Sequence, residues 1–77
     1  MPTADRADWL TARRRHIGAR IGDERRRARL TQEAVANRVG IDRPSIVLIE
    51  QGERNMTIDT LLLIADAIGV DLVDLVG

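Results

Sequence analysis

The side chains with the clearest chemical potential in this sequence are its arginines. The chain has 12 basic residues, and all of them are Arg. A guanidinium carries a permanent charge and a planar fork of N–H donors that fits phosphate oxygens. Phosphate binding would explain this choice of cation, but genomic base composition explains it too, and we favour the second explanation. The distribution of the arginines is therefore more informative than their type.

The charges are segregated along the chain, although the formal net charge is zero. Residues 1–40 hold ten Arg and five acidic residues, whereas residues 41–77 hold two Arg and seven acidic residues. A neutral protein with this dipolar distribution can present a basic face to phosphate. Nucleic acid is therefore compatible with the composition, although the acidic half would repel phosphate wherever it faced DNA.

Enzymatic activity is not expected from the residue types. The chain has no cysteine, and its one histidine, His16, lies in a basic run and is predicted to be a solvated surface residue. The acidic residues lie mostly at the expected helix starts, where capping explains them. We therefore predict no catalytic residues, no metal site and no cofactor.

The length and hydropathy favour a small cytoplasmic protein. Seventy-seven residues allow one domain with one small core. No apolar run approaches the roughly 20 residues that span a bilayer, so no membrane association is expected. Residues 1–16 are polar and charged, unlike a secretory signal, and the absence of cysteine fits a reducing compartment.

Residues 31–52 carry the strongest local signals and predict two short helices joined by a tight turn. Thr31 and Asp42 are good N-caps, and Gly40 suits the end of the first helix. Pro44 falls in the first turn of the second helix, where its missing N–H costs little, and Gly52 ends that helix. Helices over residues 32–39 and 43–51 with this spacing match a helix-turn-helix motif.

The flanking segments predict three more helices. Residues 11–29 form one, with an inner stripe of Ile17, Ile21 and Ala28. Gly18 and Gly22 lie four apart on it and would permit close approach of another backbone. Residues 58–68 have more than one apolar face, so that helix is expected at the centre of the core, and residues 72–76 form a last short helix. No alternating pattern indicates a strand, so the predicted fold is all-α.

The start of the chain is the least defined part. Residues 1–12 are predicted to be an N-terminal extension, disordered in part, and residues 13–77 the helix-turn-helix domain. Trp9 and Leu10 either begin the first helix or dock on it. Trp9 is the only aromatic residue, and we expect it to be buried in the fold or in a dimer contact.

The pattern as a whole resembles the Cro/lambda-repressor-type helix-turn-helix domain, the XRE family of bacterial and phage regulators. The resemblance covers about residues 16–76. It is carried by Ile17, Gly18, Arg20, Ile21, Arg25, Leu30, Thr31, Gln32, Glu33, Val35, Ala36, Val39, Gly40, Ile41, Ser45, Ile46, Ile49, Glu50, Gly52, Leu61, Ile64, Ala65, Ile68, Gly69, Val70, Leu72 and Leu75. It implies a compact five-helix fold and a homodimer on a partly palindromic operator in double-stranded DNA.

The resemblance also implies which side chains meet DNA. The implied contacts lie at the start of residues 32–39, on the recognition helix at residues 43–51, and in the loop that follows. They are Gln32, Arg43, Pro44, Ser45, Leu48, Arg54 and Asn55. Arg43 is the best candidate for binding guanine, and Leu48 could lie against a thymine methyl group. Arg25 and Glu50 occupy positions that commonly pair between helices, so they are expected to hold the fold.

The sequence departs from the family pattern at several positions. Arg29 stands where the family often has Gly, so a positive φ there would strain the backbone. Glu24 stands where an apolar residue is common. Pro44, Val47 and Leu48 make the recognition helix poor in hydrogen-bonding groups, which leaves room for readout through DNA shape or for a protein partner.

Two functions are therefore carried forward. The first is a sequence-specific DNA-binding transcriptional regulator, acting as a repressor or activator. The residues around Met56 and the small size resemble controller proteins of restriction–modification systems, beside phage-type repressors and antitoxins. The second is an interaction module or antitoxin with a protein partner such as a toxin or polymerase. Surplus apolar surface predicts a dimer interface at Leu63, Val73 and Val76, or alternatively at the N-terminal segment with Trp9.

Overall fold

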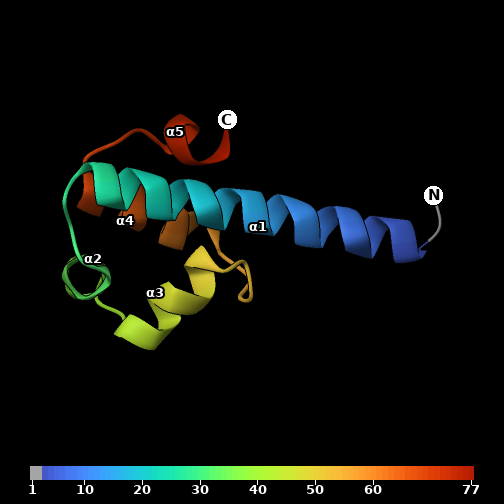
Figure 1. Ribbon diagram of the computed structural model, residues 1–77, viewed down its shortest axis with the longest axis horizontal. Helices are drawn as coiled ribbons and strands as arrows, with labels where there is room; N and C mark the ends of the chain where they lie inside the picture. Colours follow the sequence, from blue (N-terminus) through green and yellow to red (C-terminus); the bar gives the residue numbers. More distant parts are fainter. Residues whose placement is uncertain (1–2) are drawn as a thin grey trace.

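The computed structural model describes residues 3–77, which form five helices (Figure 1). They are α1 (Thr3–Arg27), α2 (Gln32–Val39), α3 (Arg43–Glu50), α4 (Ile58–Ile68) and α5 (Leu72–Val76). The long α1 lies between α5 on one side and the α2–α3 pair on the other. The predicted all-α, five-helix fold is confirmed in the described part of the chain.

The helix-turn-helix motif is defined by short polar side chains at the helix starts. Thr31 accepts a hydrogen bond from the backbone N–H of Ala34 at 3.0 Å, and Asp42 accepts one from Ser45 at 2.9 Å. Each bond satisfies one of the backbone donors that a helix N-terminus leaves free. Gly40 ends α2 with a φ of 88°, a conformation that costs glycine little. The predicted caps and the bounds of residues 32–39 are therefore confirmed.

The core is made almost entirely of aliphatic side chains, and α4 supplies the largest share. One face of α4 is buried against α2, α5 and α1, while the opposite face is open to solvent. The buried apolar residues are Ile21, Val35, Ala36, Ile46, Ile49, Leu61, Ile64, Ala65, Ala67, Ile68 and Leu75. The predicted central position of residues 58–68 is confirmed, but Ile58 and Leu62 lie on the exposed face.

Gly18 marks the closest approach between α1 and α3. A Cβ atom at this position would lie 2.5 Å from the carbonyl oxygen of Ile49 and 2.6 Å from that of Glu50. Gly22, one turn later, faces only the ends of the Arg26 and Glu50 side chains, at 3.2 Å or more. The backbone contact expected of both glycines is therefore made by Gly18 alone.

The short α5 is held by the burial of Leu75 in the core and by hydrogen bonds from one arginine of α1. Arg20 donates from Nε and Nη2 to the carbonyl oxygen of Asp74, at 3.0 and 2.6 Å, and from Nη1 to the carbonyl oxygen of Gly77 at 3.2 Å. These carbonyls lie near the C-terminal end of α5, where a cation is favourable. Arg20 therefore fixes a helix that is too short to be stable alone.

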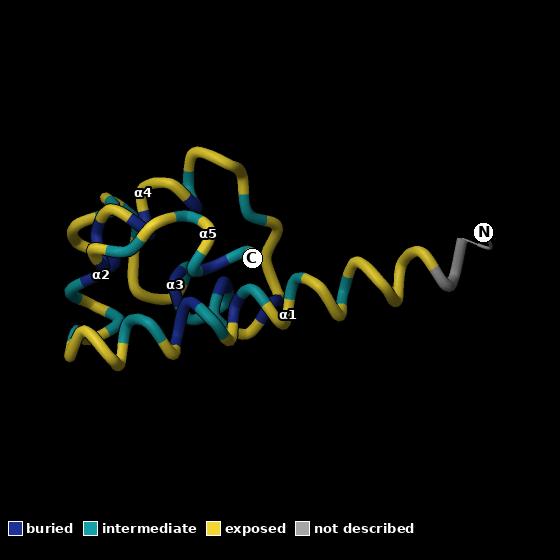
Figure 2. Tube along the Cα trace, turned by 90° about the horizontal axis from the view of Figure 1, so that it is seen from above, coloured by how far each residue is buried: buried dark blue, intermediate teal, exposed yellow. Residues whose placement is uncertain are grey.

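The first helix differs from its predicted extent at both ends. It begins at Thr3 instead of about residue 11, so the helix occupies most of the expected extension, whose residues 1–2 lie outside the described part. Residues 6–10 are exposed along the protruding end (Figure 2). Trp9 is 58% exposed, so the expectation that it is buried in the fold of one chain is wrong. Ala28 follows the end of α1 and is exposed, so it does not belong to the inner stripe.

Arg29 adopts the strained backbone conformation that a glycine would accept. Its φ is 60°, in the left-handed region. The chain turns sharply there, because the N–H groups of Arg29 and Leu30 bond back to carbonyls of the last turn of α1. The positive φ considered for Arg29 from the sequence is therefore confirmed. The backbone is strained there, because residues other than glycine are disfavoured in this region.

We expect Arg29→Gly to stabilise the fold by about 1 kcal/mol, because relief of strain outweighs the greater freedom of glycine in the unfolded chain. Urea unfolding followed by circular dichroism measures the change. Arg29→Ala is the matched control, since it removes the side chain but keeps the Cβ and should leave stability nearly unchanged. Equal stabilisation by both variants would show that the charge, not the backbone, was unfavourable.

Within residues 3–77, the helices are all too short or too polar to cross a lipid bilayer.

Candidate nucleic-acid interface

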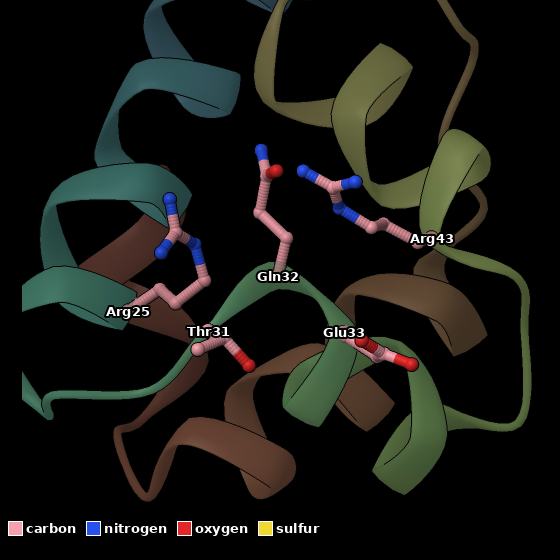
Figure 3. A pocket seen from close by; sticks show the side chains of 5 residues that line it. All are labelled: Arg25, Thr31, Gln32, Glu33 and Arg43. Carbon is pink, nitrogen blue, oxygen red and sulfur yellow. The ribbon is translucent and has the colours of Figure 1, made fainter.

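The N-terminal ends of α2 and α3 open on the same side of the molecule. A hollow of about 400 Å³ lies between them, lined by Arg25, Thr31, Gln32, Glu33 and Arg43. In Figure 3 the Gln32 side chain stands between the guanidinium groups of Arg25 and Arg43, which come from α1 and α3. Two helix N-termini and the guanidinium group of Arg43 therefore converge on this hollow, and these features favour an anionic ligand, whereas the charge of Arg25 is balanced by Glu50.

A partly buried ion pair fixes the position of Gln32 in this hollow. Arg25 donates from Nε to Glu50 Oε2 at 2.7 Å and from Nη2 to Oε1 at 3.0 Å. Gln32 donates from Nε2 to the same Oε1 at 3.3 Å, and Arg25 also binds the carbonyl oxygen of Leu30 at 2.9 Å. The pair expected from the resemblance thus links α1, the α2 start and α3. The hydrogen bond to Glu50 raises the pKa of Arg25 above its usual value.

The surface of α3 is mixed. Arg43 and Pro44 are exposed, and Ser45 is half-buried. Leu48 and Val47 are also half-buried, because their position on α3 turns part of each side chain toward the body. The outward face of α3 is consequently less apolar than its composition suggests.

Arg54 reaches back from the loop to α3. Its Nη1 donates to Ser45 Oγ at 2.6 Å, which places a second guanidinium beside the start of the recognition helix. The capping carboxylate of Asp42 lies near it. Hydrogen bonding from Ser45, with a smaller contribution from the charge of Arg54, lowers the pKa of Asp42 below its usual value. The cap therefore stabilises the fold at neutral pH, and this contribution is lost as the pH falls through the lowered pKa.

Asn55 lies apart from the other candidate DNA contacts. It lines a second hollow of about 260 Å³ with the side chains of α1, including Arg13 and Arg14. Arg13 is exposed and Arg14 is half-buried. Their spacing from Ile17, three and four residues away, could have indicated that they flank the core. The structure thus brings Gln32 together with Arg43 and Arg54 together with Ser45, whereas Asn55 lines a different hollow.

Most of the residues predicted to form a dimer interface are exposed, but one packs against the core. Leu63, Val73 and Trp9 are exposed, and a hollow beside Leu63 is lined by Leu62 and Asp59. Val76, in contrast, packs partly against the core and offers less free surface. Among the described residues, no cluster of three or more acidic or histidine side chains could hold a metal ion.

Comparison with known proteins gives a consistent result. Residues 16–76 match the family described as helix-turn-helix domain. The chain is 40% identical over 63 residues to the HTH-type transcriptional regulator y4dJ of Sinorhizobium fredii, covering 82% of each protein. It is also similar to the crystal structure of the restriction-modification controller protein C.AhdI from Aeromonas hydrophila. That similarity has a TM-score of 0.80 and 30% identity, and it covers 83% of this chain and 97% of the other.

Proposed function

Because this chain belongs to the Cro/lambda-repressor-type (XRE) family of helix-turn-helix DNA-binding transcriptional regulators, we propose that it binds a specific operator in double-stranded DNA as a homodimer. In this proposal α3 enters the major groove. The observation that supports it best is the convergence of the α2 and α3 N-termini with Gln32, Arg43 and Arg54 on one face.

Phosphate contacts would position the protein on DNA. The free N–H groups and positive ends of α2 and α3 suit phosphate oxygens. Gln32 is held in place by Glu50 at 3.3 Å and keeps one amide N–H to donate. Arg54 can move from Ser45 to a phosphate by rotating its side chain. Asn55 remains a candidate for a backbone contact further along the loop.

Base recognition would come from the first turns of α3. Arg43 is exposed and can form two hydrogen bonds to guanine O6 and N7. Ser45 can bond a base or a phosphate, and Pro44 and the exposed part of Leu48 can contact a thymine methyl group. In a homodimer two such helices would lie about 34 Å apart, one turn of DNA, and would read an operator with two-fold symmetry.

Selection of bound sequences from a pool of random duplexes tests this proposal. We expect an enriched, partly palindromic sequence with half-sites about 10 base pairs apart. Its affinity should fall on the order of 100-fold between about 50 and 200 mM salt if four phosphates are contacted. Failure to bind any duplex at low salt would exclude the DNA-binding function.

Arg43→Ala is expected to cost about 1–3 kcal/mol in each half-site, and so about 2–6 kcal/mol on the whole operator, and to relax the preference at one position in each half-site. The loss arises because the guanidinium pairs with a single base. Fluorescence anisotropy on the operator and on variants changed at each position measures it. Arg43→Lys is the matched control: it keeps the charge, so the salt dependence should persist while the guanine preference falls. An unchanged preference in Arg43→Ala would show that Arg43 only positions the helix.

The similarity to C.AhdI favours a narrower form of the proposal, in which the chain regulates genes of a restriction–modification system. Of the residues that suggested the protein-interaction alternative, Val47 and Leu48 are half-buried, which weakens the case for a partner on α3, whereas Leu63 is exposed. A toxin or polymerase partner would have to use another surface. Binding of such a partner together with loss of duplex binding would favour the alternative.

A further inference from the structure

Two helices carry surfaces of opposite charge with the same residue spacing. Each surface has two residues of like charge, seven positions apart in the sequence. Two apolar residues lie between them, three and four positions after the first charged residue. The basic stripe on α1 is Arg6, Trp9, Leu10 and Arg13, and the acidic stripe on α4 is Asp59, Leu62, Leu63 and Asp66. Neither stripe belongs to the proposed DNA interface.

Helical geometry places each stripe on a single face. Positions three, four and seven residues apart lie on one side of an α-helix. The two charges of each stripe are separated by about 10.5 Å along the axis, at a rise of 1.5 Å per residue. Because this separation is equal in the two stripes, both pairs of opposite charges can meet when the helices lie side by side, whichever direction they run.

Both stripes are open to solvent in the single chain. Trp9 and Leu10 are 58% and 46% exposed, and Leu62 and Leu63 are 48% and 50% exposed. None of the four charged residues forms an ion pair or hydrogen bond with another side chain in the described part of the protein. The two surfaces therefore have apolar area and charge available for a partner.

The basic stripe and the acidic stripe of one chain cannot contact each other. The basic stripe lies on the end of α1 that projects beyond the body (Figure 2), and α1 is one continuous helix. Folding that end back onto α4 would require breaking α1. Leu10 also lines the hollow formed with Met56 and Leu61, so a partner helix beside it would cover that hollow as well.

We propose that the partner is a second copy of this chain, in a reciprocal dimer in which the basic stripe of each copy lies on the acidic stripe of the other. This inference rests on the proposed homodimer and names its contacts. Each exposed apolar side chain offers on the order of 100 Å². The eight in two copies, with their charged neighbours, approach the roughly 1,000 Å² that a specific interface needs.

A charge-swap experiment tests the proposal in the absence of DNA. The first variant carries Arg6→Glu and Arg13→Glu, and the second carries Asp59→Arg and Asp66→Arg. Each variant alone would face like charges, so its dimer dissociation constant should rise at least about 30-fold. In an equal mixture every stripe meets one of opposite sign, so a heterodimer of near wild-type affinity should form. Sedimentation velocity at tens of micromolar measures the fraction of dimer in each variant alone and in the mixture.

Trp9 supplies a second measurement, because it is the only Trp in the chain. Its emission should shift to shorter wavelength as the wild-type protein is concentrated, with the same midpoint as dimerisation. The shift should be absent in each variant alone and should return in the mixture. Arg26→Glu with Arg27→Glu is the control, because it makes the same change of charge on α1 outside the stripe and should leave the dimer intact.

The experiment distinguishes failure of the reciprocal contact between stripes from failure of the proposed DNA-binding function. Wild-type affinity in both charge-reversed variants, or no heterodimer in a mixture of well-folded variants, would overturn the reciprocal contact and leave the operator-binding homodimer standing. A wild-type monomer that still selects a palindromic operator would overturn the contact too, and would make dimerisation dependent on DNA. Circular dichroism and thermal unfolding of each variant exclude loss of fold as the cause.

Discussion

Glu50→Ala is expected to lower the free energy of unfolding by about 3 kcal/mol, because it leaves Arg25 charged and without its partner in a largely buried site. The side chains of Arg25 and Glu50 are only 11% and 9% exposed, and two hydrogen bonds join them. The free energy of unfolding of a domain of this size is only about 5 kcal/mol. The variant should therefore be partly unfolded well below the melting temperature of the wild type.

Urea unfolding with two controls identifies the cause. Glu50→Gln keeps the shape and one acceptor but loses the charge, so it should destabilise less. The double variant Arg25→Met with Glu50→Ala removes the unpaired charge and should recover part of the loss, which a double-mutant cycle quantifies. If the double variant is as unstable as the sum of the two single variants, the ion pair is not coupled and this account of the site is wrong.

Gly18→Ala should destabilise the protein by about 2 kcal/mol or more. Alanine favours a helix by about 1 kcal/mol over glycine, so local propensity alone predicts the opposite sign. The added Cβ would lie 2.5 Å from a backbone carbonyl oxygen of α3, and neither helix backbone can yield as a flexible side chain would. The helices must separate, and α3 must shift relative to the proposed DNA-binding face.

Gly22→Ala is the matched control for Gly18→Ala. It makes the same chemical change one turn along the same helix, where only side-chain ends lie near, at 3.2 Å or more. It should therefore change the free energy of unfolding by less than the Gly18 variant. Thermal unfolding compares the two, and equal effects would show that helix propensity, not contact with α3, governs both positions.

Much of the fold could be predicted because its signals are local. The caps Thr31, Asp42 and Thr57 and the terminating Gly40 act through backbone groups within four residues, so their types alone locate α2, α3 and α4. The buried stripe of α4 also follows from its spacing. Positions such as Ala28 were misassigned because a turn centred on Arg29 interrupts the helical period, and an arginine gives little sign of a positive φ.

The parts of the site that could not be predicted depend on contacts between distant segments. The first residues of α1, from Thr3 onward, show no helical repeat of apolar residues in the sequence. Local signals therefore did not distinguish this part of the helix from a frayed end. The bond between Arg54 and Ser45 joins residues nine apart through a turn whose path is not encoded in either residue. The half-burial of Leu48 likewise depends on how α3 packs against α1, which Gly18 sets.

The attachment of α5 to α1 has a consequence for the order of folding. Arg20 binds the carbonyl of Asp74, 54 residues away, whereas the contacts of α2 with α3 and with α4 join segments that are closer in sequence. Closing a long loop costs more entropy than closing a short one, so the α2–α4 unit should assemble first and α5 should dock late. The acidic end of the chain, with Asp71 and Asp74, would therefore meet the arginine-rich α1 last, and raising the ionic strength should slow that final step.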